Sequence, residues 1–138
     1  MNIDSILNGY VIDHIQAGKA MEIYRYLGLD DLDCSVAIIK NAKSQNMGKK
    51  DIIKIDQEIP LDLNLLAYID PGVTVNLIRD GALVEKIKPQ MPERVVNVMK
   101  CMNPRCITQV EAELDQIFVL TDKEQQIYRC FYCEAQSK

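Results

Sequence analysis

The chain has 138 residues, 48% of them hydrophobic and 26% charged, which is ordinary for a globular protein that folds in water. It has no apolar run of the roughly 20 residues that cross a bilayer, and its formal net charge of −4 argues against general affinity for nucleic acids. No basic stretch followed by an apolar one opens the sequence, so we expect no signal peptide. With reduced cysteines, this predicts a cytoplasmic protein whose partners include neither membranes nor nucleic acids.

Residues 1–92 are expected to form a small α+β domain. Residues 17–27 carry apolar side chains at helical spacing, and Gly28 follows as the expected C-cap. Asp80-Gly81 stands between two apolar runs and predicts a type I′ hairpin turn. The expected strands are 10–15, 34–40, 50–55, 73–79 and 82–87, the expected helices are 17–27 and 61–68, and 41–49 is expected to be a loop.

The order of these elements is β-α-β-β-α-β with one extra hairpin strand, which is the split βαβ arrangement. It predicts a ferredoxin-like antiparallel sheet with two helices on one face. Residues 88–93 contain two prolines in four positions and are expected to form a stiff linker. Residues 93–138 are then expected to form a small all-β domain, with strands at 95–100, 112–120 and 126–129.

Four cysteines in this second part form two close pairs. Cys101 and Cys106 are separated by four residues, 23 residues follow, and Cys130 and Cys133 are separated by two. Such pairs are typical of a tetrahedral metal site with four thiolate ligands, in which the metal stabilises a segment too small to fold on its own apolar core. We expect one structural zinc ion. Two disulfides, which would need an oxidising compartment, and iron in a rubredoxin-like site are the alternatives.

A cationic stretch lies between residues 40 and 54 of this otherwise acidic chain. It holds five lysines against one acid, Asp51. A solvated loop face is the ordinary interpretation of such a run. The functional interpretation is an anion site, for which lysine supplies a compact charge, with Arg79 and Lys86 of the hairpin close by. The five residues are Lys40, Lys43, Lys49, Lys50 and Lys54.

Three polar residues in expected strands are candidates for binding a ligand. His14 is the only histidine, and a lone histidine is more often structural, but near a strand end it can border one cleft with Asp13. An aspartate can accept from a ribose hydroxyl, and a histidine can donate to a phosphate. Asn76 interrupts an apolar strand and needs a hydrogen-bond partner, which is either a neighbouring loop or a base or sugar.

The sequence does not indicate an enzyme. It has no glycine-rich phosphate loop, no His-x-Glu beside the cysteines and no evident pair of nucleophile and base, while Cys34 has the setting of a small buried hydrophobe. We therefore expect a sensor joined to a metal-held docking module. Two alternatives are a zinc-ribbon nucleic-acid binder and an enzyme acting on nucleotides. Residues 95–138 hold five basic against six acidic side chains, the opposite of the bias that a DNA-binding ribbon needs.

Several specific motifs follow one another in a recognisable order. They are Gly9-Tyr-Val-Ile-Asp-His-Ile15, Gly48-Lys-Lys-Asp-Ile-Ile-Lys-Ile55, Val73-Thr-Val-Asn76, Lys88-Pro-Gln-Met-Pro-Glu93 and the two cysteine pairs. Along nearly its whole length the chain resembles the regulatory-chain family of aspartate carbamoyltransferase. The resemblance implies a non-catalytic subunit of pyrimidine biosynthesis. It implies that the N-terminal domain binds CTP or UTP as inhibitor and ATP as activator, and that the zinc domain docks on catalytic chains.

The resemblance also implies an assembly and a set of site residues. In the family holoenzyme, two catalytic trimers are joined through three regulatory dimers, so a second regulatory chain is an expected partner. Asn103 and Glu134 match positions that face the catalytic chain. The nucleotide site carried over by position consists of Asp13, His14, Lys54, Asn76, Ile78 and Lys86, with the apolar Ile6 and Val11 lining it and Leu83 in a slot that the family fills with a similar side chain.

The chain departs from the family pattern in a few places. Its N-terminal arm reads Asn2-Ile3-Asp4, without the basic residue that some members carry before this segment. A second, metal-bridged nucleotide co-site is therefore not implied. Gly81 replaces a larger hairpin residue that can touch the base, so the resemblance does not say how this chain discriminates between bases.

Overall fold

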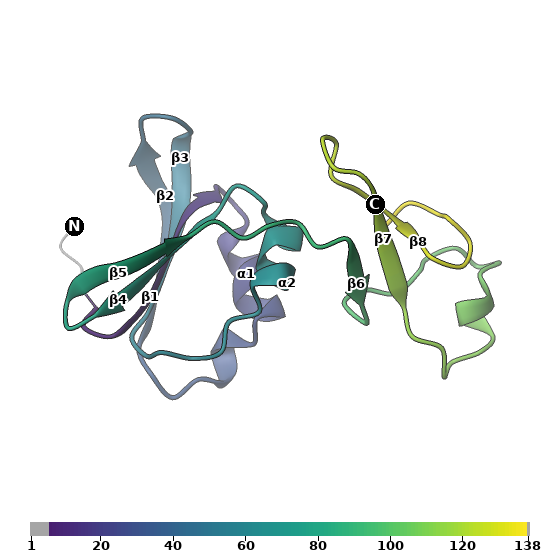
Figure 1. Cartoon of the computed structure of the whole chain (residues 1–138), viewed down its shortest axis with the longest axis horizontal. Coiled ribbons are helices and arrows are strands. Elements are labelled where there is room, and N and C mark those ends of the chain that lie inside the picture. Colours follow the sequence, from purple (N-terminus) through teal and green to yellow (C-terminus); the bar gives the residue numbers. More distant parts are fainter. Residues whose placement is uncertain (1–5, 138) are drawn as a thin grey trace. The chain divides into compact units, whose positions relative to one another are not determined.

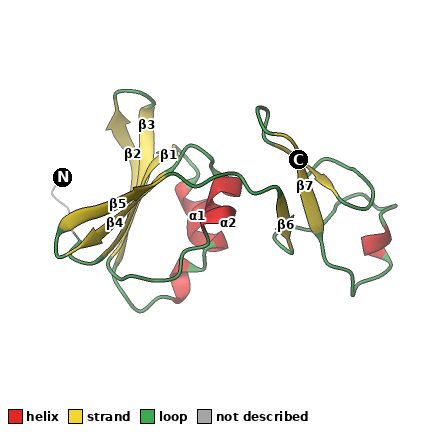
Figure 2. Ribbon diagram, in the orientation of Figure 1, coloured by secondary structure: helices red, strands yellow, loops and turns green. Residues whose placement is uncertain are grey.

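The computed structural model describes residues 6–137, so the segment Asn2-Ile3-Asp4 lies outside the described residues. The chain divides into two compact units, Met1–Gln90 and Met91–Lys138. Figure 1 follows the chain through both units, and Figure 2 marks their helices and strands.

The first unit is a five-stranded antiparallel sheet with two helices on one face, as predicted from the sequence (Figure 1). The strand order is β2-β3-β1-β4-β5, so that the first strand is central and the extra hairpin strand lies at one edge. The strands are β1 (Gly9–Gln16), β2 (Val36–Ser44), β3 (Gly48–Ile55), β4 (Thr74–Arg79) and β5 (Ala82–Ile87). The helices are α1 (Ala20–Tyr26) and α2 (Leu63–Ile69), with a 3-10 turn, η1 (Leu29–Asp31).

Cross-strand pairing explains why only one face of this sheet is covered. Ile12 of β1 stands opposite Ile53 of β3 and Val75 of β4, and all three are buried. Directly paired residues point to the same face, so this row meets the helices, where Ile23 and Leu66 complete the core. On each strand, the residues that alternate with this buried row point to the opposite face of the sheet, which carries no helix.

The two helices begin at carboxylates. In α2 the side chain of Asp62 accepts from the Leu65 amide at 3.0 Å, which is an ordinary N-cap. In α1 the carboxylate comes from another strand: Asp51 of β3 accepts from the amides of Gly18, at 3.0 Å, and Ala20, at 3.3 Å. The helix was expected from residue 17 and begins at Ala20, where Asp51 accepts from an amide of the first turn that has no partner within the helix. After the helix, Gly28 lies in the left-handed region, with a φ of 65°.

The segment 41–49, expected to be a loop, is mostly strand, because β2 continues to Ser44 and β3 begins at Gly48. A bulge at Asn41, with a φ of 60°, redirects β2, and the Asn41 amide donates to Asp51 at 3.0 Å. The predicted type I′ turn is present, since Asp80 and Gly81 both have positive φ, 52° and 76°. The sheet also requires a glycine at position 9, where a Cβ atom would overlap the carbonyl oxygen of Ile55.

The second unit is a small antiparallel sheet, as predicted, and two of its three strands are shorter than expected. They are β6 (Arg94–Val96), β7 (Ile117–Asp122) and β8 (Ile127–Cys130), with a 3-10 turn, η2 (Ile107–Gln109), between the first two. Residues 97–100 and 112–116, expected to extend two of these strands, lie outside them. Among the described residues of this unit, the buried hydrophobic side chains other than cysteines are Val95, Phe118 and Tyr128.

So few buried apolar side chains give little stability to a segment of this size. The second unit therefore needs another source of stability. None of the helices within residues 6–137 has the length and hydropathy needed to cross a membrane.

Candidate functional site

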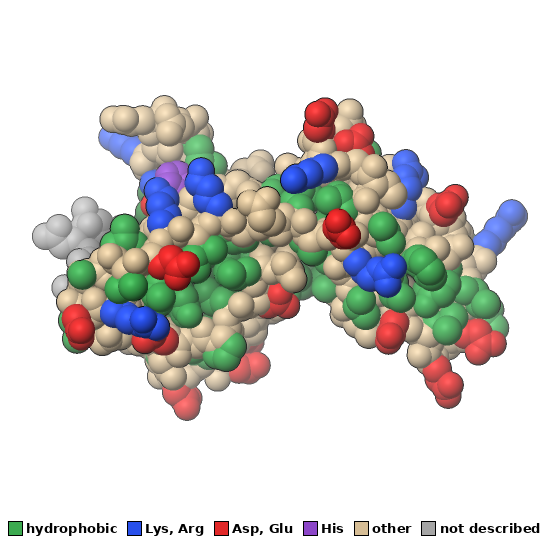
Figure 3. Space-filling view, in the orientation of Figure 1, with side chains coloured by type: hydrophobic (Ala, Val, Ile, Leu, Met, Phe, Trp, Pro, Cys, Tyr) green, Lys and Arg blue, Asp and Glu red, His purple; other side chains and the backbone are tan. Residues whose placement is uncertain are grey.

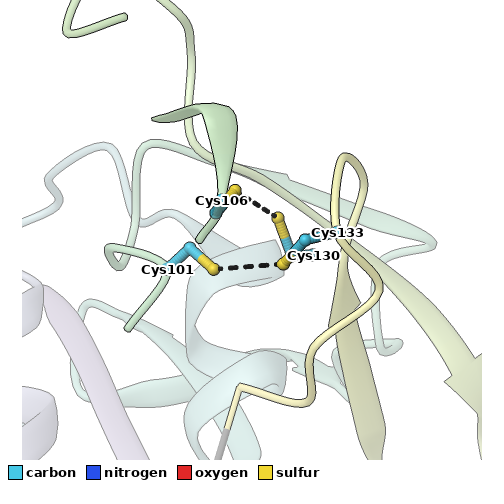
Figure 4. A group of neighbouring side chains, drawn as sticks. All are labelled: Cys101, Cys106, Cys130 and Cys133. Atoms are coloured by element: carbon cyan, nitrogen blue, oxygen red, sulfur yellow. Dashed lines mark hydrogen bonds between the residues drawn. The ribbon is translucent and has the colours of Figure 1, made fainter. Parts of the chain in front are cut away.

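Four cysteine sulfurs converge in the second unit (Figure 4). All lie within 4.8 Å of one another, with Cys101 and Cys133 at 3.5 Å and Cys106 and Cys130 at 3.8 Å. Sulfurs placed about 2.3 Å from a central ion in a tetrahedron are about 3.8 Å apart, so the cluster has the size of a four-thiolate metal site. The four cysteines are free thiols, which disfavours the two-disulfide alternative.

Neighbouring groups orient the sulfurs. Thr108, at the turn η2, donates its hydroxyl to the Cys106 sulfur at 3.1 Å, and the Gln116 side-chain oxygen accepts from the Cys101 amide at 3.0 Å. Sequence reasoning missed Thr108, although a hydroxyl residue two positions after a ligand is a usable signal. Such partners fix the ligand geometry before an ion binds.

The protein alone does not stabilise four thiolates. Burial raises the pKa of the Cys101 thiol to about 12 and also raises the pKa of Cys130. At Cys133 burial acts in the same direction, but hydrogen bonds from the Ala135 amide and the Asn103 side chain outweigh it and lower its pKa to about 6. A cation bound among the four sulfurs would favour the deprotonated form of all of them, because its charge stabilises thiolates.

In the first unit, the uncovered face of the sheet carries a row of four paired residues. Val11 of β1 stands opposite Lys54 of β3 and Asn76 of β4, and Asn76 stands opposite Lys86 of β5. The pairing places two ammonium groups on either side of an apolar residue and an amide. The Oδ1 atom of Asn76 is buried and has no hydrogen-bond partner among the described residues. A buried acceptor without a partner is uncommon, and it leaves a position at which a water molecule or another group from outside the chain can donate a hydrogen bond.

One end of this face is apolar. Ile78 follows Asn76 by two residues and therefore shares its face, and it is paired with Leu83 of β5. Leu83 is 58% exposed, while Ile78 and Ile6, which precedes β1, are half-buried. The face thus offers apolar surface next to the row of lysines.

The other end holds Asp13 and His14. Asp13 accepts from the ammonium group of Lys50 at 3.0 Å, and the Nδ1 atom of His14 lies 2.9 Å from the Thr74 hydroxyl. His14 has a φ of 59° at the bulge of β1, which interrupts the alternation of side chains and lets both residues border one face. Figure 3 shows blue lysine and arginine side chains gathered beside the purple histidine. The contacts of Lys50 with Asp13 and of Thr74 with His14 depend on how the strands pair, and the sequence analysis did not predict them.

The cationic stretch does not act as one patch. Asp51, the acid counted against the lysines, is fully buried towards the helices. Lys43 and Lys49 are paired near the exposed end of the hairpin, and Lys40 is exposed as well. Arg79, considered as a further cation, is paired with Glu58 at 2.8 Å. Two of the five lysines, Lys50 and Lys54, remain on the uncovered face.

Comparison with known proteins assigns both units. Residues 1–90 match the family model described as the aspartate carbamoyltransferase regulatory chain, allosteric domain, and residues 93–138 match the model of its metal binding domain. The chain belongs to this family. It is 48% identical to the aspartate carbamoyltransferase regulatory chain of Clostridium botulinum, over 97% of the chain and 92% of that relative. Identity to the Clostridium tetani protein is 45%, over 97% and 94%, and to that of Bifidobacterium longum 41%, over 100% and 99%.

Regulatory chains are non-catalytic subunits, so the family accounts for the lack of an evident catalytic set in the sequence. The uncovered sheet face lies in the allosteric domain and the cysteine cluster in the metal-binding domain of this regulatory chain. Asn103 and Glu134, expected to face a catalytic chain, are both near the cluster: the side chain of Asn103 accepts from the Arg105 amide at 3.1 Å, and the Glu134 amide donates to the Cys130 carbonyl at 2.9 Å. The same unit exposes the apolar side chains Met102, Ile107 and Val110.

Proposed function

We propose that nucleoside triphosphates control aspartate carbamoyltransferase through the uncovered sheet face of this regulatory chain. CTP or UTP binds there as inhibitor and ATP as activator. The observation that carries the proposal is the row Lys54, Val11, Asn76 and Lys86, in which a buried amide oxygen without a partner lies between two lysines. A charged ligand with hydrogen-bonding groups fits such a row better than an apolar one.

The charges suggest how the ligand lies. Lys54 and Lys86 are three strand spacings apart, about 14 Å between their Cα atoms, so their long side chains can reach one triphosphate from two sides. Asn76 offers an acceptor and two donors to a base or a sugar, and Asp13 can accept from a ribose hydroxyl. His14 is a candidate donor to phosphate. The apolar Ile6, Val11, Ile78 and Leu83 line the rest of the site.

The metal in this proposal is one structural zinc ion. Four thiolates fill a tetrahedral coordination shell and leave no position for water or substrate, so the ion stabilises the second unit and does no chemistry. The stabilised unit exposes Met102, Ile107 and Val110 to solvent, and it also carries Asn103 and Glu134. Together these residues form the surface that docks on catalytic trimers, while a second copy of the chain completes a regulatory dimer in the cytoplasm.

Regulation requires that a nucleotide bind the two states of the assembly unequally. A coupling free energy of about 1–3 kcal/mol is usual for such systems. By family resemblance, pyrimidine nucleotides favour the state with low affinity for substrate, and ATP favours the other state.

The test is to mix the zinc-loaded chain with its cognate catalytic trimer and to measure mass by light scattering, before and after a mercurial strips the metal. A large complex that collapses on stripping, and whose activity responds to CTP and ATP, is the expected result. Absence of a complex in both conditions would contradict docking. An intact complex whose activity ignores every nucleotide would contradict the sensing role alone.

A further inference from the structure

Three successive residues fasten the end of the linker to the metal-binding unit. The carbonyl of Pro92 accepts from the hydroxyl of Tyr128 at 2.7 Å. The carbonyl of Glu93 accepts from the Leu120 amide at 2.8 Å, and the guanidinium of Arg94 lies 5.5 Å from the centre of the Phe131 ring. The chain is therefore held to β8, to β7 and to the loop between two metal ligands as soon as it enters this unit.

The contact between Tyr128 and Pro92 controls a backbone torsion. The ring of proline fixes its φ, and the peptide bonds on both sides are planar, so ψ of Pro92 is the soft torsion left at this residue. Rotation about ψ turns the Pro92 carbonyl, which is the group that the Tyr128 hydroxyl holds. Proline has no amide hydrogen, and this carbonyl is its one backbone hydrogen-bonding group.

Tyr128 is well placed to hold that carbonyl firmly. Its side chain is 1% exposed, and it stands opposite Leu120 in the sheet. It precedes the metal ligand Cys130 by two residues on β8, and Phe131, which contacts Arg94, follows that ligand directly. The side-chain contacts to Pro92 and Arg94 thus come from residues within two positions of the metal ligand Cys130.

We propose that Tyr128 is a positioning residue for allosteric coupling, because its hydroxyl fixes the direction in which the linker leaves the metal-binding unit. This inference rests on the proposed function. The stiff segment 88–93 is the covalent connection between the allosteric and the metal-binding domain. If ψ of Pro92 could rotate freely, a conformational change that a nucleotide produces in the allosteric domain would be averaged out at the linker. A fixed ψ transmits that conformational change to the metal-binding domain.

The experiment compares Tyr128→Phe with the wild-type chain in the assembled holoenzyme. The variant keeps the buried ring and removes the hydroxyl. Metal content, mass of the complex and the Kd of CTP should stay at wild-type values. The coupling between CTP binding and catalytic activity should fall by about five-fold, which is the change in an equilibrium constant that one ordinary hydrogen bond corresponds to. Tyr24→Phe removes a hydroxyl from a partly buried tyrosine of α1 and should leave coupling unchanged.

Hydrogen exchange followed by mass spectrometry gives a second readout in the same complex. Peptides covering 91–96 should exchange several-fold faster in Tyr128→Phe, and peptides covering 101–106 should not. Wild-type coupling in the variant, or unchanged exchange at 91–96, would overturn the inference and leave the proposed function standing. A wild-type holoenzyme that does not respond to CTP would overturn the proposed function, and this inference with it.

Discussion

Lys50 and Asp13 form an ion pair, with 3.0 Å between Nζ and Oδ1, on the face of the sheet that no helix covers. The same Asp13 oxygen accepts from the His14 amide at 2.6 Å. Burial acts to raise the pKa of this carboxyl, but the hydrogen bonds from Lys50 and the His14 amide, with the charge of Lys50, outweigh it and lower the pKa below its ordinary value of 3.8.

This lowered pKa predicts a definite direction of pH dependence. A carboxylate whose folded pKa lies below its unfolded pKa stabilises the protein fully above the unfolded pKa, and the contribution is lost as pH falls through the folded pKa. The NMR titration of the Asp13 carboxyl carbon should therefore have its midpoint below 3.8. In Lys50→Met the midpoint should move upward. An unchanged midpoint in that variant would show that the ion pair does not set the pKa.

Lys86→Ala should weaken every nucleoside triphosphate, by about ten-fold, because a charge-assisted hydrogen bond to phosphate is lost. Calorimetric titration with CTP and ATP measures the change, and the loss should shrink at high salt. Lys43→Ala is the matched control, since Lys43 is exposed on β2 and lies outside the row of paired residues. CTP affinity near the wild-type value in Lys86→Ala would rule out the phosphate role.

Asn76→Leu should separate binding from stability. Removing a buried amide that lacks a partner for Oδ1 should leave the free energy of unfolding unchanged or raise it by about 1 kcal/mol. Nucleotide affinity should fall, because the ligand loses that acceptor. Chemical denaturation and calorimetric titration measure the two effects, and Asn64→Leu on the exposed side of α2 is the control. A large loss of stability would mean that Asn76 is a structural residue.

Thr108→Val should weaken metal binding by about ten-fold, because the hydroxyl that donates to the Cys106 sulfur is removed while side-chain volume is kept. Competition with a chromophoric chelator measures the affinity. Thr108→Ser keeps the hydroxyl and should retain most of it. Thr121→Val removes an exposed hydroxyl that donates to the Ile127 carbonyl and should have no effect on the metal.

Cys106→Ser should abolish metal binding and docking on catalytic chains while sparing nucleotide binding, because the cluster and the uncovered sheet face lie in different units. Elemental analysis should find one zinc ion per wild-type chain and none in the variant, whereas iron in its place would favour the rubredoxin-like alternative. Cys34→Ser removes the cysteine outside the cluster and should keep the metal.

The sequence determined the metal centre and the class of fold. Cysteine spacing was enough to predict the centre, because each short loop brings two sulfurs together, and the fold of the second unit then joins the two pairs. Likewise, the order and apolar patterns of the strands and helices are local properties, so the antiparallel sheet with two helices on one face could be predicted. The limits of the elements were less accurate, because Asp51 of β3 decides where α1 begins and pairing extends β2 into the expected loop.

Local sequence patterns did not indicate which polar residues meet; the family resemblance grouped several of them, and the tertiary structure decided how they are paired. Lys54, Val11, Asn76 and Lys86 share a row because of strand register, which depends on hydrogen bonds between segments far apart in sequence. The lysine stretch is divided between an exposed hairpin and a sheet face for the same reason, and Asp51 turns inward. The bond from Tyr128 to Pro92 joins residues 36 positions apart and has no local pattern. Spacing in the sequence determines which side chains a single loop brings together. Packing between distant segments determines which other side chains meet.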